Sequence, residues 1–280
     1  MVKFVKFLLF FIIFQTLLAV FTQFFGIFYF WVIFVPNLLA VLVIVFLFFK
    51  NYKIIKFKNF RIDRVAFAVV IISAVTLYQV HYNYTGKYSM VNDVLFQYHE
   101  VKNMQYVYPY FSDEWYAVAL VKESIKNHSL PLNNPFDSSF FPNLEMFFHS
   151  FIAEIMMLFG FDPLTQYTAL SVFINTLIIL LAYCFLRINN VSKLTSAISS
   201  LSILYITCGS NLPGIWNLIP ITMGIVLSLI GFCFLSAFDF KMAVLSFVFG
   251  ALFYPPLIIF YAVALPVYLF SCSKKYVSNN

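Results

Sequence analysis

Long uninterrupted apolar segments, without alternation of apolar and polar residues, make up most of this chain. No charged residue occurs between Lys6 and Lys50, and as one straight helix this stretch would be about twice as long as the hydrocarbon core of a bilayer is thick. It is therefore predicted to turn near residues 23–26 and to form two helices, Phe7 to Phe24 and Ile27 to Phe49. The alternative for the first helix is a cleaved signal peptide, but no small-residue cleavage site follows it.

The same pattern predicts further membrane-spanning helices downstream. They are Val65 to Val80, Leu164 to Leu186, Leu194 to Cys208, Ile215 to Phe238 and Met242 to Phe270. Tyr254-Pro255-Pro256 interrupts the last of these, and because proline removes a backbone donor and clashes with the preceding turn, we interpret it as two half-spans. The prediction is then eight crossings, whereas one tilted helix at this place would give seven.

The composition of the chain differs from that of soluble globular proteins. It is 62% hydrophobic and only 10% charged, with a mean hydropathy of +0.91, whereas soluble domains carry about 25% charged residues. In hydrocarbon every backbone polar group needs an internal partner, and the unbroken apolar runs favour helices over a β-barrel. We therefore predict an all-α integral membrane protein with about eight transmembrane helices.

The charges predict an orientation. The loop from Lys50 to Arg64 contains six basic residues and one acid, which by the positive-inside rule marks it as cytoplasmic. The segment from Tyr82 to Asp162 contains nine of the 11 acidic residues and is predicted to be external. The chain is thus divided into an N-terminal two-helix hairpin with its basic loop, residues 1–64, and a membrane module, residues 65–280, with external loop 82–162. The expected location is the plasma (inner) membrane of a prokaryote, as a multi-pass protein.

Charge and cysteine usage exclude two further classes. The net charge of +6 comes from basic residues beside apolar spans, where they would face anionic lipid headgroups, so no nucleic-acid partner is expected. The four cysteines, Cys184, Cys208, Cys233 and Cys272, lie in or next to apolar runs without CxxC spacing. Neither a disulfide framework nor a zinc site is expected.

Two helices are predicted within the external loop. The first begins at Ser112, a good N-cap residue, and runs to about Asn127, with apolar residues on one side and lysines on the other. The second follows Pro142-Asn143 and ends at Phe159, before Gly160. Both are expected to be amphipathic and to lie along the membrane surface.

Asp113 and Glu114, in the first turn of the first external helix, are the main candidate for chemistry. Acids there complement the helix dipole, which alone would explain them. The same dipole keeps a carboxylate ionised at neutral pH, as a general base or a metal ligand requires. Glu145 and His149, four residues apart, are predicted to share a face of the second helix, either as a functional pair or as an exposed pair without a task.

The order of these parts resembles the amino-terminal module of GT-C glycosyltransferases over about Val65 to Phe270. The resemblance is carried by a membrane span followed by four short motifs and a further span that ends in arginine. The motifs are Ser112-Asp113-Glu114-Trp115-Tyr116, Leu130-Pro131, Pro142-Asn143-Leu144-Glu145 and Gly160-Phe161-Asp162-Pro163. The acidic pair is the most specific of them, and the rest is architectural.

This resemblance implies transfer of a sugar from a polyprenyl-phosphate donor to a lipid, glycan or protein acceptor on the extracytoplasmic face. Asp113 or Glu114 would deprotonate the acceptor or bind a divalent metal ion such as Mg²⁺ or Mn²⁺. Glu145, His149 and Tyr116 would contact substrate. The donor phosphate would need a cation, for which the external lysines Lys87, Lys102, Lys122 and Lys126 are the candidates.

Two departures from the family keep other functions open. No arginine is external on this topology, and family members are commonly longer, with further spans and often a soluble carboxy-terminal domain. A partner subunit could supply such a part. The alternatives are a non-catalytic membrane assembly subunit and a transporter or lipid flippase.

Overall fold

The computed structural model describes residues 1–50, 63–83, 87–92, 95–100, 112–137, 139–140, 142–205, 207–208, 212–213 and 217–277. The described part is all-helical apart from two short antiparallel hairpins. Its helices are α1 (Val2–Phe24), α2 (Phe30–Lys50), α3 (Arg64–Asn83), α4 (Ser112–Asn127), α5 (Met146–Phe159), α6 (Pro163–Ile188), α7 (Lys193–Leu201), α8 (Pro220–Ser236), α9 (Phe240–Phe253) and α10 (Leu257–Val277), with the 3-10 helix η2 (Ser202–Tyr205) after α7. The hairpins are β1 (Lys87–Asn92) with β2 (Leu95–Glu100), and β3 (Thr207–Cys208) with β4 (Leu212–Pro213).

Several predicted boundaries are confirmed. The chain turns between α1 and α2 at Gly26, which has a positive φ of 68°. Gly160 ends α5 in the left-handed conformation, and the Asp162 side chain accepts a hydrogen bond from the Thr165 N–H to begin α6. Residues 254–256 separate α9 from α10, as the two prolines predict.

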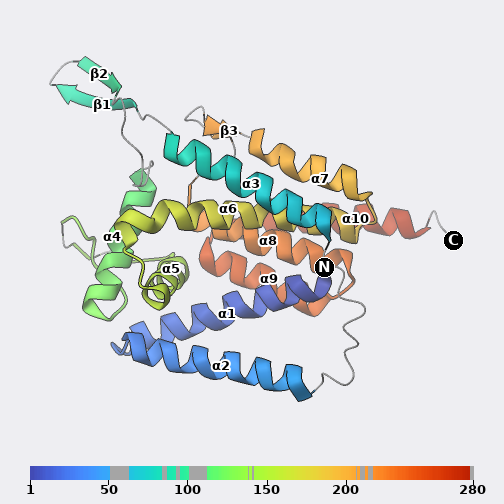
Figure 1. Ribbon diagram of the computed structural model, residues 1–280, viewed down its shortest axis with the longest axis horizontal. Coiled ribbons are helices and arrows are strands. Elements are labelled where there is room, and N and C mark those ends of the chain that lie inside the picture. The colour runs from blue at the N-terminus through green and yellow to red at the C-terminus, as the bar shows by residue number, and fades with distance from the viewer. Residues whose placement is uncertain are drawn as a thin grey trace.

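The long helices run back and forth between two ends of the molecule (Figure 1). Both α1 and α8 connect these ends, and α4 with α5 lies at the end where α1 finishes and α6 begins (Figure 1). The opposite end holds the N-terminus, the α6–α7 turn and the α8–α9 turn (Figure 1). There Lys193 forms an ion pair with Asp63 at 3.5 Å, and Tyr183 donates a hydrogen bond to the same carboxylate.

Two predicted spans are shorter than expected. The segment predicted as one helix from Leu194 to Cys208 is helical only to Leu201 and continues as η2 and then β3. The segment predicted from Ile215 begins as α8 at Pro220, where Thr222 accepts a hydrogen bond from the Ile219 N–H and fixes the first turn. The sequence-based prediction made both helices too long, because apolar composition alone does not mark where a helix begins or ends.

The amphipathic prediction holds for α4 and is wrong for α5. In α4 Val118 and Val121 are buried while Lys122 and Lys126 are exposed. In α5 every residue from Phe148 to Met156 is buried, because α1, α2, α4, α8 and α9 all pack against it. The polar side chains of His149, Ser150 and Glu154 are hydrogen-bonded inside the protein instead.

Much of the outer surface is apolar. Large exposed side chains cover α1, α2, α3 and α10, including Phe7, Phe21, Leu39, Phe67 and Ile259. Two helices, α1 and α6, are long and apolar enough to cross a membrane. Buried serines and threonines within the helices mostly donate to carbonyls one turn back, such as Ser73 to Val69 and Ser228 to Gly224. These features support membrane association.

Candidate functional site

The acidic pair at the start of α4 divides between two environments. Asp113 is exposed, whereas Glu114 is only 2% exposed. Glu114 Oε1 accepts a hydrogen bond of 2.7 Å from the backbone N–H of Leu218, and the Leu218 carbonyl accepts one of 2.5 Å from the Tyr167 hydroxyl. Glu114 therefore holds the segment before α8 against α4 and α6, and Asp113 is the member of the pair that faces outward.

Asp113 lies within electrostatic range of the residue that precedes α5. Burial raises the pKa of the half-buried Glu145, and the charge of Asp113 raises it further. Tyr116, one turn after Asp113, has its pKa raised by burial and by the charges of Asp137 and Glu145. The structure thus brings the predicted residues Asp113, Tyr116 and Glu145 together with Asp137, which sequence analysis did not single out.

The exposed Asp137 carboxylate is held by its own loop. The Ser139 N–H and hydroxyl donate to it at 2.9 and 2.6 Å, and these bonds lower the pKa of Asp137. The Phe136 ring packs on the Tyr116 ring with 5.9 Å between centroids. The loop between α4 and α5 therefore provides one side of the acidic cluster, which consists of Asp113, Asp137 and Glu145.

His149 does not share an exposed face with Glu145. It is 2% exposed, and Glu145 precedes α5 as its N-cap residue. His149 Nδ1 lies 3.1 Å from Asn143 Oδ1, and burial lowers the pKa of His149 to about 3, so the ring is neutral at pH 7. A neutral ring that donates from Nδ1 fixes the Asn143 oxygen. The buried Asn143 Nδ2 group has no hydrogen-bond partner among the residues that the structure describes.

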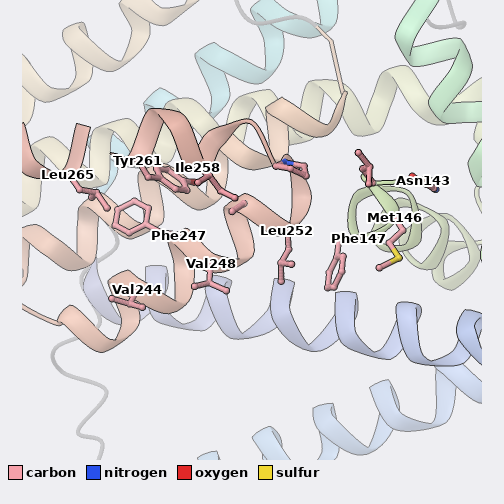
Figure 2. Close-up of a pocket in the computed structure, with 13 residues that line it drawn as sticks. Asn143, Met146, Phe147, Val244, Phe247, Val248, Leu252, Ile258, Tyr261 and Leu265 are labelled. Carbon is pink, nitrogen blue, oxygen red and sulfur yellow. The ribbon is translucent and has the colours of Figure 1, made fainter. Parts of the chain in front are cut away.

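An apolar groove begins at Asn143. Its volume is about 670 Å³, within the range of small-molecule sites in proteins. Figure 2 shows side chains from α9 and α10 along one part of the groove and Asn143, Met146 and Phe147 at the other. The lining comprises Asn143, Leu144, Met146, Phe147, Val244, Phe247, Val248, Ala251, Leu252, Pro255, Ile258, Tyr261 and Leu265. Glu145 lies between lining residues, so the groove and the acidic cluster adjoin.

The two predicted phosphate cations whose side chains are described, Lys122 and Lys126, do not join this cluster. Lys122 lies near Asp162, whose pKa its charge helps to lower, and so occupies the side of α4 that faces the start of α6. Lys126 is in the last turn of α4. Lys102 lies outside the described residues, and for Lys87 only the backbone of β1 is described.

The donor set at the start of α4 does not suit the divalent metal ion that the resemblance implies. One oxygen of Glu114 is engaged by the Leu218 N–H, and the carboxylate is buried away from Asp113. Within the described ranges, no group of three or more His, Cys, Asp or Glu side chains could hold a metal ion. No chemical step is therefore assigned to a metal here.

Family models, curated proteins and solved structures were compared with this chain, and none matches it. In the sequence Asn143 stands out only as part of a motif and of a helix-start signal, and no pattern there points to Leu218 or to the groove. The proline that precedes Asn143 marked a helix start, but no local signal shows that an amide will line a groove formed by helices 100 residues downstream.

Proposed function

We propose that the chain is a multi-pass membrane glycosyltransferase of the GT-C type, or the amino-terminal part of one, that uses a polyprenyl-phosphate-linked sugar. The observation that carries this proposal is the apolar groove between α5, α9 and α10, which ends beside the acidic cluster of Asp113, Asp137 and Glu145. A lipid with a long apolar tail and a polar, reactive head needs these two environments side by side.

The groove suits the apolar polyprenyl tail of such a lipid. Apart from Asn143 and the Tyr261 hydroxyl, its lining side chains are hydrocarbon, ring or thioether groups. Each buried methylene contributes about 0.8 kcal/mol, so a few isoprene units would give most of the binding energy. The exposed apolar surfaces of α9 and α10 would let such a chain enter sideways from lipid.

Asn143 suits the phosphate head of such a lipid. Its Nδ2 group is the one polar donor among the described lining residues that is buried and unpartnered, and His149 holds the amide by its oxygen. An amide N–H directed at a phosphate oxygen would hold the head at the groove end, where the described lining residues include no lysine or arginine.

Asp113 is then the base. It is exposed at the start of a 16-residue helix, whose dipole favours the ionised form. Deprotonation of an acceptor hydroxyl by this carboxylate would accompany attack on the sugar, with the lipid phosphate as leaving group. Glu114 would have a positioning role, because its carboxylate binds the backbone N–H of Leu218 and not the substrate.

The membrane topology is part of the proposal. Eight crossings would place both ends of the hairpin α1–α2 and the positive residues Arg64, Arg187, Lys193 and Lys241 at the cytoplasmic end, with α4 and α5 at the external surface of a prokaryotic plasma membrane.

A transporter is the second candidate, and one observation favours it. Glu154 is a fully buried ionisable residue that contacts the hairpin α1–α2, and such residues in membrane proteins often mark ion or proton pathways. A transporter has no sugar-transfer step that would need Asp113, so the Asp113 variant in the test below separates the two candidate functions.

The test is sugar transfer in membranes that contain the full chain and any partner subunit. Replacing Asp113 with Asn should lower the transfer rate by roughly 10²- to 10⁴-fold, the usual contribution of general base catalysis, while binding of polyprenyl phosphate is kept. The matched control is Glu123→Gln on the same helix, where the carboxylate bonds only to Asn127 one turn on. Equal transfer by Asp113→Asn and wild type would overturn the catalytic assignment.

A further inference from the structure

A line of polar side chains, buried at Glu154 and Gln15 and half-buried at Asn37, joins α5 to both helices of the N-terminal hairpin. The Asn37 Nδ2 group donates to Glu154 Oε1 at 3.4 Å, and the Gln15 Nε2 group donates to Asn37 Oδ1 at 2.5 Å. Glu154 is 0% exposed and Gln15 is 2% exposed. Three helices that are distant in sequence therefore meet at one buried carboxyl group.

This cluster has fewer donors than acceptors. Within the described part of the chain, Glu154 Oε2 and Gln15 Oε1 are both buried without a hydrogen-bond partner, and Asn37 divides its donors between Glu154 and the Ile33 carbonyl. An ionised carboxylate whose one side-chain hydrogen bond is 3.4 Å long is strongly unfavourable in such a place. A proton on the carboxyl removes the charge and turns one unsatisfied acceptor into a donor.

We propose that Glu154, with Asn37 and Gln15, forms a buried proton-binding site between α5 and the α1–α2 hairpin, and that its exchangeable proton is held at neutral pH. The site is separate from the acidic cluster next to α4, and the inference does not depend on the proposed glycosyltransferase activity.

The arrangement suits a proton better than a metal cation. Asn37 turns its amide nitrogen toward Glu154, and its oxygen is already engaged by Gln15. A hard cation takes about six oxygen ligands, whereas the two oxygens left without partners in this cluster belong to Glu154 and Gln15. A proton requires only the carboxyl oxygen that binds it.

The electrostatic environment supports this assignment. Burial raises the pKa of Glu154 to about 8, while hydrogen bonds from Asn37 and the Ala19 backbone lower it. The charged residues of described side chains on the helices packed against α5 are Lys3, Lys6, Asp113, Glu114, Lys122, Glu123, Lys126 and Lys241, and none of them is among the causes of this shift. His149, on α5 itself, faces Asn143.

Proton loss should weaken the contact between α5 and the hairpin. Because the pKa in the folded protein lies above the ordinary value of 4.5, the stabilising effect of the proton is complete below about pH 4.5. It is lost as the pH rises through about 8. The hairpin should therefore be held most tightly in acid, progressively less tightly as the pH rises through neutrality, and least tightly above about pH 8.

The experiment is infrared spectroscopy of the full chain in lipid nanodiscs, which detects the C=O stretch of a protonated carboxylic acid. Wild type at pH 7 should show a band that disappears with a midpoint near pH 8 and that Glu154→Gln lacks at every pH, while Glu123→Gln retains it. Asn37→Ala removes a donor to the carboxylate and should move the midpoint to higher pH. This second variant keeps the test decisive if Glu154→Gln does not fold.

Three results would overturn the inference. The first is a pH 7 spectrum that is the same in wild type and Glu154→Gln, and the second is a midpoint unchanged in Asn37→Ala. The third is a thermal unfolding temperature that rises when sodium chloride replaces choline chloride at constant ionic strength and does so only while Glu154 is present, which would identify a sodium site instead.

Discussion

At the residue scale, neighbouring polar side chains in this protein have different tasks according to their burial. Asp113 and Glu114 are adjacent in sequence, yet one is exposed next to Glu145 and the other is bonded to the Leu218 backbone. His149 likewise holds Asn143 and does not face solvent. Residue type and spacing in the sequence therefore indicate which residues are candidates for a functional site. Burial then distinguishes an exposed side chain that can react from a buried one that positions other groups.

The proposed role of Asn143 gives a prediction at this scale. Asn143→Ala should weaken binding of polyprenyl phosphate by roughly 10- to 100-fold, the loss expected for one hydrogen bond to a charged group. Asn143→Asp should weaken it at least as much, because a carboxylate repels the phosphate. Binding can be followed with a fluorescent short-chain polyprenyl phosphate in detergent.

The control for this prediction is Leu132→Ala, an exposed residue in the loop after α4 that does not line the groove. The expected order is wild type and Leu132→Ala together, with both Asn143 variants well below. Equal affinity of all four proteins would show that the phosphate lies elsewhere.

At the element scale, α8 and α9 pack closely because α8 carries a glycine at their contact. A Cβ atom added at Gly231 would lie 2.6 Å from Phe247 Cε1, so no side chain fits without moving that ring. Phe247 also lines the groove, which links helix packing to the shape of the site.

Gly231→Ala is therefore expected to destabilise the protein by about 1–3 kcal/mol, the usual range for overpacking a core. It should also reduce polyprenyl phosphate binding, since the displaced Phe247 ring lies at the groove wall. Thermal unfolding in detergent and the same fluorescent binding assay measure the two effects. Val244→Ala on the exposed face of α9 is the control for stability, and a Gly231→Ala protein as stable as this control would contradict the packing argument.

Element boundaries were predictable where a local signal marks them. Ser112, Gly160 and the pair Pro255-Pro256 gave the start of α4, the end of α5 and the break before α10. The early end of α7 and the full burial of α5 were not predictable, because both depend on neighbours far away in sequence. For the same reason the sequence indicated the acidic cluster in part but gave no sign of the groove or of the partners of Glu154.

At the scale of the whole molecule, the arrangement of the long helices makes the proposed topology testable. With the native cysteines replaced by alanine, Leu132→Cys in the loop after α4 should react with an impermeant maleimide on intact cells. Ser192→Cys before α7 should react only after the membrane is opened, because the α6–α7 turn lies at the opposite end (Figure 1).

Ala117→Cys, buried in α4, should stay unlabelled in both conditions and serves as the control for nonspecific access. Labelling of Leu132→Cys only from the cytoplasmic side would reverse the orientation, and the proposed external chemistry would then have to be abandoned.

The enclosed position of α5 has a consequence for biogenesis. The ribosome completes α1 and α2 about 100 residues before Glu154, so on the proposed topology the amides of Gln15 and Asn37 would enter the bilayer without their carboxyl partner. Helices α8 and α9, which close the other side of α5, are synthesised later still. Docking of the hairpin should therefore wait until α5 has been made. A chaperone or insertase that shields amides in lipid would help this protein more than one that only inserts apolar helices.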